Sequence, residues 1–401
     1  MLRRGLPLEA ALPSAAADLE RPDDRGLAHA LAAGVLRHMA DLDRLIDGAT
    51  EKRLPADAKA RAVLRLALFQ ALGLETPPHA AITTVLPLVD GGPRRLVHGV
   101  FGAVMRKGAR LPEVPALPPA VEARWKAAWG AKAVSAAARA GAAPPPLDLT
   151  LRDPAETASW AERLGGTSLM PGHVRLPRGT AVPDLPGFAE GAWWVQDLAA
   201  SLPARLIGAG GGRAFDLCAA PGGKTLQLAA AGWAVTALDA SEARLGRVRE
   251  NLDRIGLNAG TVQGDVMQWA PPAPAEAVLL DAPCSATGIF RRHPDVLHRA
   301  SARAIADLAA QQAAMLARAA DWVKPGGRLV YSVCSAEPEE GERVAAGFAR
   351  AGFAVDPVAA AELPDGLAPD ASGMLRVPPG ALAEAGGADG FFVARFRRIH
   401  E

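Results

Sequence analysis

The chain has 401 residues, of which half are hydrophobic and only 5% are aromatic, and its formal net charge is +1. This length exceeds one ordinary hydrophobic core and predicts two or three domains. With neither a long apolar run nor an apolar leader segment, the composition argues against a membrane protein and favours a cytoplasmic one.

The charge is divided unevenly along the chain. Residues 1–145 carry 20 Lys/Arg against 14 Asp/Glu, whereas residues 146–401 carry 24 against 29. A basic module joined to a mildly acidic one suggests an anionic partner for the first. The local basic cluster consists of Arg94, Arg95, His98, Arg106, Lys107 and Arg110. A solvated helix face explains this cluster equally well, so charge alone leaves both interpretations open.

The first predicted region, residues 1–115, is all-α. Apolar residues recur near the 3.6-residue helical period between Leu27 and Ile46 and again between Val63 and Leu72, where Gly73 is a plausible stop. Two further helices are predicted around 80–89 and 94–107. The proline-rich stretch LPEVPALPPA, residues 111–120, then predicts a linker.

The second predicted region, residues 116–190, is a linker helix followed by a small α+β unit. The helix carries Trp125 and Trp129 and ends before the breaker GAAPPPL. LDLTLRD alternates like a strand, PAETASWAERL has helical spacing, and HVRLP predicts a second strand.

The third predicted region, residues 191–401, alternates strands with helices, which predicts an α/β fold with a mostly parallel sheet. The seven predicted strands are RAFDLC, AVTALD, GTVQGD, AVLLDAP, GRLVYSVCS, FAVDP and FFVARF. The last two follow each other closely and predict an antiparallel edge. This order is typical of a Rossmann-like methyltransferase fold.

The loop AAPGGK, between the first strand of this region and the next helix, has the character of a cofactor loop. Its glycines let the backbone approach a ligand, and the helix N-terminus offers N–H donors. The spacing fits neither the dinucleotide nor the Walker pattern, whereas the carboxylate of S-adenosylmethionine could accept these hydrogen bonds. Asp239, Asp265 and Asp281 close successive strands, where acids bind ribose hydroxyls or an adenine amino group. A role as a helix cap or turn residue explains each of these acids taken singly, but it explains the series of three poorly.

Cys218, Cys284 and Cys334 fit neither a disulfide framework nor zinc spacing, so no metal is expected. Cys284 in DAPCS and Cys334 in YSVCS each follow an apolar strand, whereas Cys218 lies within one and suits a buried small hydrophobe. A thiolate that adds to carbon 6 of cytosine makes carbon 5 nucleophilic, and this step benefits from an acid near ring nitrogen 3. Two strand-end thiols beside Asp281 therefore predict covalent methylation of a base that has left its stack. The nearby segment RRHPDVLHR, residues 291–299, is either an RNA phosphate contact or a solvated loop.

The motifs DLCAAPGGKT, ALDAS, QGD, DAPCSATGIFRRHPD, KPGGRLVYSVCS and DGFFVARFRR, in this order, resemble those of the Sun-type RNA 5-methylcytosine methyltransferases. The N-terminal helices look like a NusB-type RNA-binding domain, and the combination is similar to the RsmB-type 16S ribosomal RNA methyltransferases. The middle segment LTLRD departs from the LRVN-like pattern of such proteins, and YSVCS replaces the commoner YSTCS.

This resemblance implies Cys334 as the nucleophile, Cys284 as the group that releases product, and Asp281 near the base. It implies cofactor contacts from Cys218, Ala219, Ala220, Pro221, Gly222, Gly223, Lys224, Asp239, Arg244, Asp265 and Asp281. The predicted function is therefore S-adenosyl-L-methionine-dependent methylation of a cytosine in RNA, with ribosomal RNA as partner and a monomeric enzyme. A tRNA-directed enzyme and an inactive RNA-binding assembly or antitermination factor are the alternatives. The adenine N6 chemistry is disfavoured because it needs no thiol.

Overall fold

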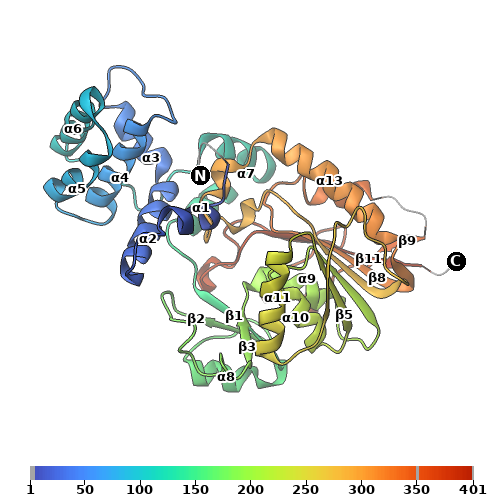
Figure 1. Ribbon diagram of the computed structural model, residues 1–401. Helices are drawn as coiled ribbons and strands as arrows, with labels where there is room; N and C mark the ends of the chain where they lie inside the picture. Colours follow the sequence, from blue (N-terminus) through green and yellow to red (C-terminus); the bar gives the residue numbers. More distant parts are fainter. Residues whose placement is uncertain (1–4, 349–351, 400–401) are drawn as a thin grey trace. The chain divides into compact units, whose positions relative to one another are not determined.

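The computed structural model describes residues 5–348 and 352–399. It divides into two compact units (Figure 1), of which the first comprises Met1–Ala143 with Phe290–Ala300, and the second Pro144–Ile289 with Ser301–Glu401. The division into three functional domains at 1–115, 116–190 and 191–401 stays a prediction.

The first unit is helical, as the apolar spacing predicts. A core of aliphatic side chains, among them Leu42, Leu64 and Val97, is fully buried between its helices. The predicted linker lies between the last two N-terminal helices, and the helix that carries Trp125 is packed with this unit. Its elements are α1 (Leu8–Ala15), α2 (Pro22–Arg37), α3 (Met39–Asp47), α4 (Lys59–Gly73), α5 (Pro78–Val85), η1 (Leu86–Leu88), α6 (Gly91–Arg106), α7 (Pro119–Gly141) and α12 (Val296–Arg299).

The segment Phe290–Ala300 corrects one expectation from the sequence. Arg291 is only 3% exposed, and its carbonyl oxygen accepts a hydrogen bond from Arg37 at 3.1 Å. His298 Nε2 lies 2.8 Å from the carbonyl oxygen of Leu36, and Asp295 accepts from the backbone N–H of Leu8. Because the Arg291 side chain is buried and His298 Nε2 bonds to Leu36, neither side chain is a free surface for RNA phosphates, and that prediction is wrong for them.

A three-stranded antiparallel sheet opens the second unit, in the order β2-β1-β3. The predicted strands and helix are confirmed as β1 (Leu147–Leu151), α8 (Thr157–Leu164) and β2 (His173–Leu176), with η2 (Pro154–Glu156) and β3 (Trp193–Val195) added. Asp148 on β1 and Arg175 on β2 form a buried bidentate pair in which both oxygen–nitrogen distances are 2.7 Å. Trp193 and Trp194, both on β3, are buried.

The larger sheet has eight strands within the described residues, in the order β10-β11-β8-β7-β4-β5-β6, with β9 paired to β11. The strands β6, β5, β4, β7 and β8 run parallel, and β11 pairs antiparallel with β8, β9 and β10. This confirms the mostly parallel sheet with an antiparallel edge and adds one strand that the sequence did not predict, β10. The strands are β4 (Arg213–Leu217), β5 (Ala234–Asp239), β6 (Gly260–Gln263), β7 (Ala275–Asp281), β8 (Val323–Val333), β9 (Phe353–Val355), β10 (Leu375–Val377) and β11 (Phe391–Arg398).

Helices cover both faces of this sheet (Figure 1), as buried strands without polar alternation require. Along β7, Val278 and Leu280 enter a core shared with α13, whereas Ala277 and Leu279 enter a second core shared with α9. The remaining elements are α9 (Leu198–Ile207), α10 (Gly223–Ala230), α11 (Glu242–Ile255), η3 (Thr287–Ile289), α13 (Ala302–Ala320), α14 (Glu342–Gly347), η4 (Ala360–Glu362) and η5 (Ala383–Ala385).

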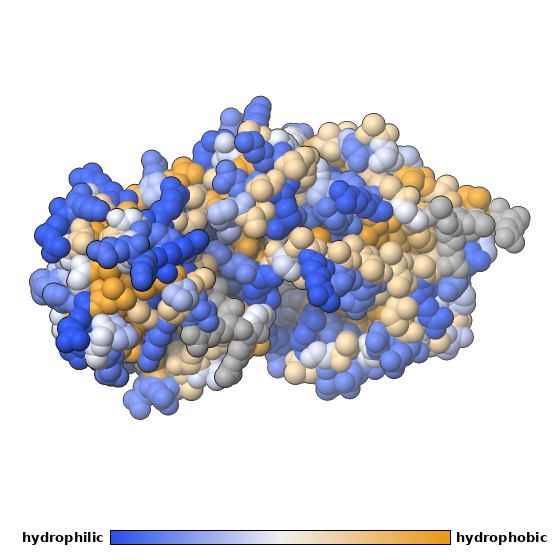
Figure 2. All heavy atoms as spheres, turned by 90° about the horizontal axis from the view of Figure 1, so that it is seen from above, coloured by the Kyte–Doolittle hydropathy of each residue, from blue (hydrophilic) through white to orange (hydrophobic). Residues whose placement is uncertain are grey.

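On the face drawn in Figure 2, hydrophilic and hydrophobic residues are intermixed. Of the helices in residues 5–348 and 352–399, none has the length and apolar character needed to span a membrane.

Candidate active site

The carboxyl ends of five parallel strands meet at one edge of the large sheet. The register places Leu217 of β4 opposite both Leu238 of β5 and Leu280 of β7. The next residues along these strands are therefore neighbours at the edge, since parallel strands advance together. The predicted site residues at this edge, in strand order, are Asp265, Asp239, Cys218, Asp281 and Cys334.

The loop that follows β4 turns sharply from the sheet into α10. Cys218 and Gly222 both have left-handed backbone conformations, with φ of 62° and 105°. A Cβ at Gly222 would lie 3.2 Å from the Val248 side chain. Both the left-handed backbone and this close approach favour glycine at position 222. The backbone N–H of Ala219 donates to Leu238 at 3.0 Å, which fastens the loop to β5. The predicted loop over residues 218–224 is therefore a compact turn at the sheet edge.

Asp239 holds this loop from the end of β5. Its carboxylate is buried and accepts from the backbone N–H groups of Ala220 at 3.2 Å and Ser241 at 3.0 Å. Arg244, predicted as a cofactor contact, pairs with Asp239 at 3.3 Å and donates to the Ala220 carbonyl at 2.7 Å. The carboxylate of Asp239 accepts several donors at once at the sheet edge, which suits a ligand that presents hydroxyl groups.

Asp265 follows β6 with an exposed side chain, and its Oδ1 accepts the backbone N–H of Met267 at 2.9 Å. With Asp239 and Asp281, it gives acceptors at three strand ends on one edge. Acceptors in a row, beside the glycine turn and the first N–H groups of α10, fit the hydroxyl, amino and carboxylate groups of S-adenosyl-L-methionine.

Asp216, one residue before this loop, was not singled out in the sequence. It is fully buried in β4, where one oxygen accepts the Thr225 hydroxyl at 2.5 Å and the other has no hydrogen-bond partner among the described residues. Burial raises the pKa of Asp216 to about 7. The sequence signal that could have identified Asp216 is an acidic residue inside an otherwise apolar strand. Cys218 is similarly affected, because burial and neighbouring carboxylates raise the pKa of its thiol.

The other two thiols lie side by side. The Sγ atoms of Cys284 and Cys334 are 3.5 Å apart, although 50 residues separate them in the chain. The pKa of the Cys284 thiol lies well above its usual value. The causes are its hydrogen bond to Cys334, its burial and nearby negative charge. Of this pair, Cys284 is therefore the thiol whose ionisation is disfavoured.

The Lys224 side chain lies at the site, next to Asp281. Its Nζ donates to Asp281 Oδ2 at 2.7 Å, and it lies 5.3 Å above the Phe391 ring. The other oxygen of Asp281 accepts the Ser332 hydroxyl at 2.9 Å. Although burial opposes it, the charge of Asp281 raises the pKa of Lys224, and Lys224 also interacts electrostatically with Cys334. An ammonium near a sulfur stabilises the thiolate that nucleophilic attack needs.

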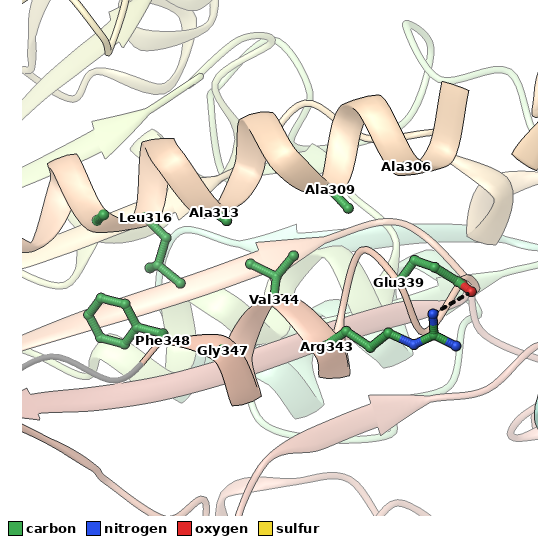
Figure 3. A pocket seen from close by; sticks show the side chains of 10 residues that line it. Ala306, Ala309, Ala313, Leu316, Glu339, Arg343, Val344, Gly347 and Phe348 are labelled. Carbon is green, nitrogen blue, oxygen red and sulfur yellow. Dashed lines mark ion pairs between the residues drawn. The ribbon is translucent and has the colours of Figure 1, made fainter. Parts of the chain in front are cut away.

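The site has no metal-like cluster: three or more His, Cys, Asp or Glu side chains do not converge anywhere in the part of the chain that the structure describes. A separate groove of about 600 Å³ lies between α13 and α14 (Figure 3). Alanines of α13, Val344 and Phe348 line it, and the ion pair Glu339–Arg343 closes one end. It contains neither thiol, so it is distinct from the strand-end site.

The chain resembles known proteins over most of its length. Residues 207–397 match the family 16S rRNA methyltransferase RsmB/F, and residues 2–110 match the NusB family. The ribosomal RNA small subunit methyltransferase B of Pseudomonas putida is 37% identical over 98% of this chain and 94% of that protein.

Two solved structures share the fold. The crystal structure of PH0851 has a TM-score of 0.74 at 23% identity and covers 98% of this chain and 96% of that one. The structure of NSun6 from Pyrococcus horikoshii with SFG has a TM-score of 0.61 at 18% identity, over 71% of this chain and 99% of that one.

The Rossmann-like sheet with its strand-end acids and thiols defines an S-adenosyl-L-methionine-dependent RNA methyltransferase. The chain belongs to the RsmB/F family of 16S rRNA methyltransferases and carries an N-terminal NusB-like region.

Proposed function

We propose that the enzyme methylates carbon 5 of a cytosine in 16S ribosomal RNA through a transient covalent bond to Cys334. The observation that carries this proposal is the pair of sulfurs 3.5 Å apart, beside the Lys224–Asp281 ion pair. Methylation of a ring nitrogen or a ribose oxygen has no use for two thiols. The coarse activity, RNA methylation, follows from the family.

In the proposed reaction the Cys334 thiolate adds to carbon 6, and the electron pair moves to carbon 5, which becomes nucleophilic. S-adenosyl-L-methionine, when bound, supplies the methyl group that carbon 5 takes up. A base then takes the carbon 5 proton, which restores the double bond and expels Cys334 as a thiolate. The other thiol, Cys284, is close enough to donate its proton to the departing Cys334 thiolate, which is the release role expected of it.

Asp281 is proposed to bind the base near ring nitrogen 3. Its two oxygens are held by Lys224 and Ser332, so the carboxyl group has a fixed direction at the end of β7. The loop 218–224, Asp239 and Asp265 are proposed to hold the cofactor. Arg244 acts in this proposal by tying Asp239 to the loop, and Cys218 by packing beneath it.

The family and the 37% identical relative favour ribosomal over transfer RNA as the substrate. The intact thiol pair and Lys224–Asp281 contact argue against an inactive assembly factor. As part of the same proposal, the protein acts as a monomer in the cytoplasm, where ribosomal RNA is modified.

The test is a comparison of Cys334→Ala and Cys284→Ala in the full-length enzyme. We expect Cys334→Ala to abolish methyl transfer while calorimetry still detects cofactor binding. We expect Cys284→Ala to slow release, so that a covalent RNA–protein adduct accumulates on a denaturing gel. Bisulfite sequencing of RNA from a deletion strain, with and without the restored gene, identifies the cytosine.

Cys218→Ala is the matched control for the adduct alone, because it removes a thiol that the proposal assigns to the cofactor loop and keeps out of the covalent step. Full turnover by Cys334→Ala would contradict the covalent route. Methylation of transfer RNA alone in the deletion strain experiment would contradict the ribosomal assignment.

A further inference from the structure

One buried carboxylate connects the two thiol-bearing loops. Glu340, fully buried just before α14, accepts the backbone N–H of Ser285 at 2.8 Å and also its hydroxyl. The same carboxylate accepts the hydroxyl of Ser335 at 2.5 Å. Ser285 follows Cys284 and Ser335 follows Cys334, so a single side chain binds the residue next to each sulfur.

The network extends into the sheet and its covering helix. Gln312 of α13 donates to Glu340 at 3.0 Å and to the Pro283 carbonyl at 2.9 Å. The Tyr331 hydroxyl donates to the backbone oxygen of Glu340, and the Gln312 side-chain oxygen lies 3.2 Å from the same hydroxyl. Both carboxylate oxygens of Glu340 thus have two donors each, and a buried carboxylate satisfied in this way fixes the groups around it.

Apolar packing does not fix these loops in the same way. The groove between α13 and α14 leaves space between small alanine side chains and α14 (Figure 3). Fewer dispersion contacts join α14 to α13 there than in a close-packed interface. The hydrogen bonds of Glu340 and Gln312 therefore connect the segment before α14 to the Cys284 loop, together with those from Ala336 to Thr287 and from Gly288 to Cys334.

The charge of Glu340 also acts on Cys284. The charged or titratable groups that influence Cys284 are Cys334, which directly follows β8, Tyr331 of β8, and Glu340 from the segment before α14. After the hydrogen bond to Cys334 and burial, electrostatic interactions with Cys334 and Glu340 raise the pKa of the Cys284 thiol. A negative charge near a thiol disfavours its ionisation.

We propose that Glu340 is a positioning residue that holds the Cys284 and Cys334 loops in contact. This inference rests on the proposed covalent function, because the position of the two sulfurs matters for catalysis only if both take part. No substrate contact is assigned to Glu340, which acts through Ser285 and Ser335.

The experiment compares Glu340→Gln, Glu340→Ala and Ser335→Ala in the full chain. Glu340→Gln keeps the shape, since serine hydroxyls can rotate to accept from an amide, but it removes the charge. Alkylation of each cysteine by iodoacetamide, followed by mass spectrometry across pH, reports on the thiols without any RNA. We expect the midpoint for Cys284 to fall by about one pH unit in Glu340→Gln. In Glu340→Ala we expect kcat to fall about 100-fold, with KM for RNA and cofactor within about twofold.

Glu339→Gln is the matched control, because it removes the neighbouring but more exposed carboxylate, which pairs with Arg343 at 3.1 Å. It should leave both the alkylation profile and kcat unchanged. An unchanged Cys284 profile in folded Glu340→Gln overturns the proposal. If Glu340→Ala does not fold, Ser335→Ala decides, since unchanged kcat there overturns the positioning role.

The two proposals fail in different ways. If Cys334→Ala still methylates RNA while the Cys284 profile of Glu340→Gln shifts, the covalent function is wrong and the action of Glu340 on the thiols stands.

Discussion

Gly288 allows a quantitative test of how closely the thiol site is packed. Its N–H donates to the carbonyl oxygen of Cys334 at 3.0 Å, and its own carbonyl accepts from the N–H of Gly390 at 2.9 Å. A Cβ on Gly288 would lie 2.0 Å from the carbonyl oxygen of Gly390. Backbone atoms on both sides leave no flexible side chain to move away, so Gly288→Ala must displace a main-chain segment.

Relief of this clash needs a movement of more than about 1 Å, since nonbonded carbon and oxygen atoms pack at about 3.5 Å. Overpacking of this kind costs about 1–3 kcal/mol of unfolding free energy. A displacement of about 1 Å at a site that positions reacting groups costs about 100-fold in rate. We therefore expect Gly288→Ala to lose both stability and kcat, because the same hydrogen bond holds Cys334.

Urea denaturation and single-turnover methyl transfer measure the two effects. Gly390→Ala is a graded variant, since its Cβ would lie 3.0 Å from the Gly288 Cα atom and should cost less. Gly246→Ala in α11 is the control: a Cβ there meets nothing within 4 Å, so the helix should gain up to about 1 kcal/mol. If Gly288→Ala unfolds and turns over like the wild type, the close backbone approach does not position Cys334.

Two further predictions concern charge. Asp216 has a pKa raised to about 7 against about 3.9 in an unfolded chain, so its ionisation destabilises the fold as pH rises from about 4 to 7. Asp216→Asn should therefore flatten the fall in unfolding free energy between about pH 4 and 7, and an unchanged slope in urea titrations would show that Asp216 is already ionised at low pH. Arg94 and Arg95 are both exposed on α6, and replacing them by Glu in the full chain should weaken RNA binding. The salt dependence of binding should fall by about one to two counterions. If the variant and the wild type have equal slopes in salt titrations of RNA binding, the basic cluster is only a solvated helix face.

The strand ends were predictable because a parallel sheet brings the carboxyl ends of its strands to one edge. Asp239, Asp281 and Cys334 needed only the strand pattern to be recognised as neighbours at that edge. The helices of the first unit were equally accessible, since apolar spacing alone defines an amphipathic helix. The roles of these residues in binding and chemistry stay predictions.

Pairings across long sequence distances could not be read from the chain. The contact between Lys224 and Asp281 joins residues 57 positions apart, and the network of Glu340 depends on how α13 and the segment before α14 pack. Local signals also misled: α9 contains Pro203, which obscured it, and the three-residue strand β10 is too short for a pattern. The basic character of residues 291–299 suggested a surface, whereas the tertiary structure buries Arg291.

The path of the chain between the two units has a consequence for how the protein can be dissected. It passes from one unit to the other after residues 143, 289 and 300, so the helical unit is not a contiguous N-terminal piece. A truncation that removes the first 115 residues also removes α2, which contacts Arg291 and His298. The buried guanidinium of Arg291 then loses part of the structure that packs around it. A loss of activity in such a fragment could come from this structural disruption as well as from a loss of affinity for RNA. Point substitutions in the intact protein separate the two effects.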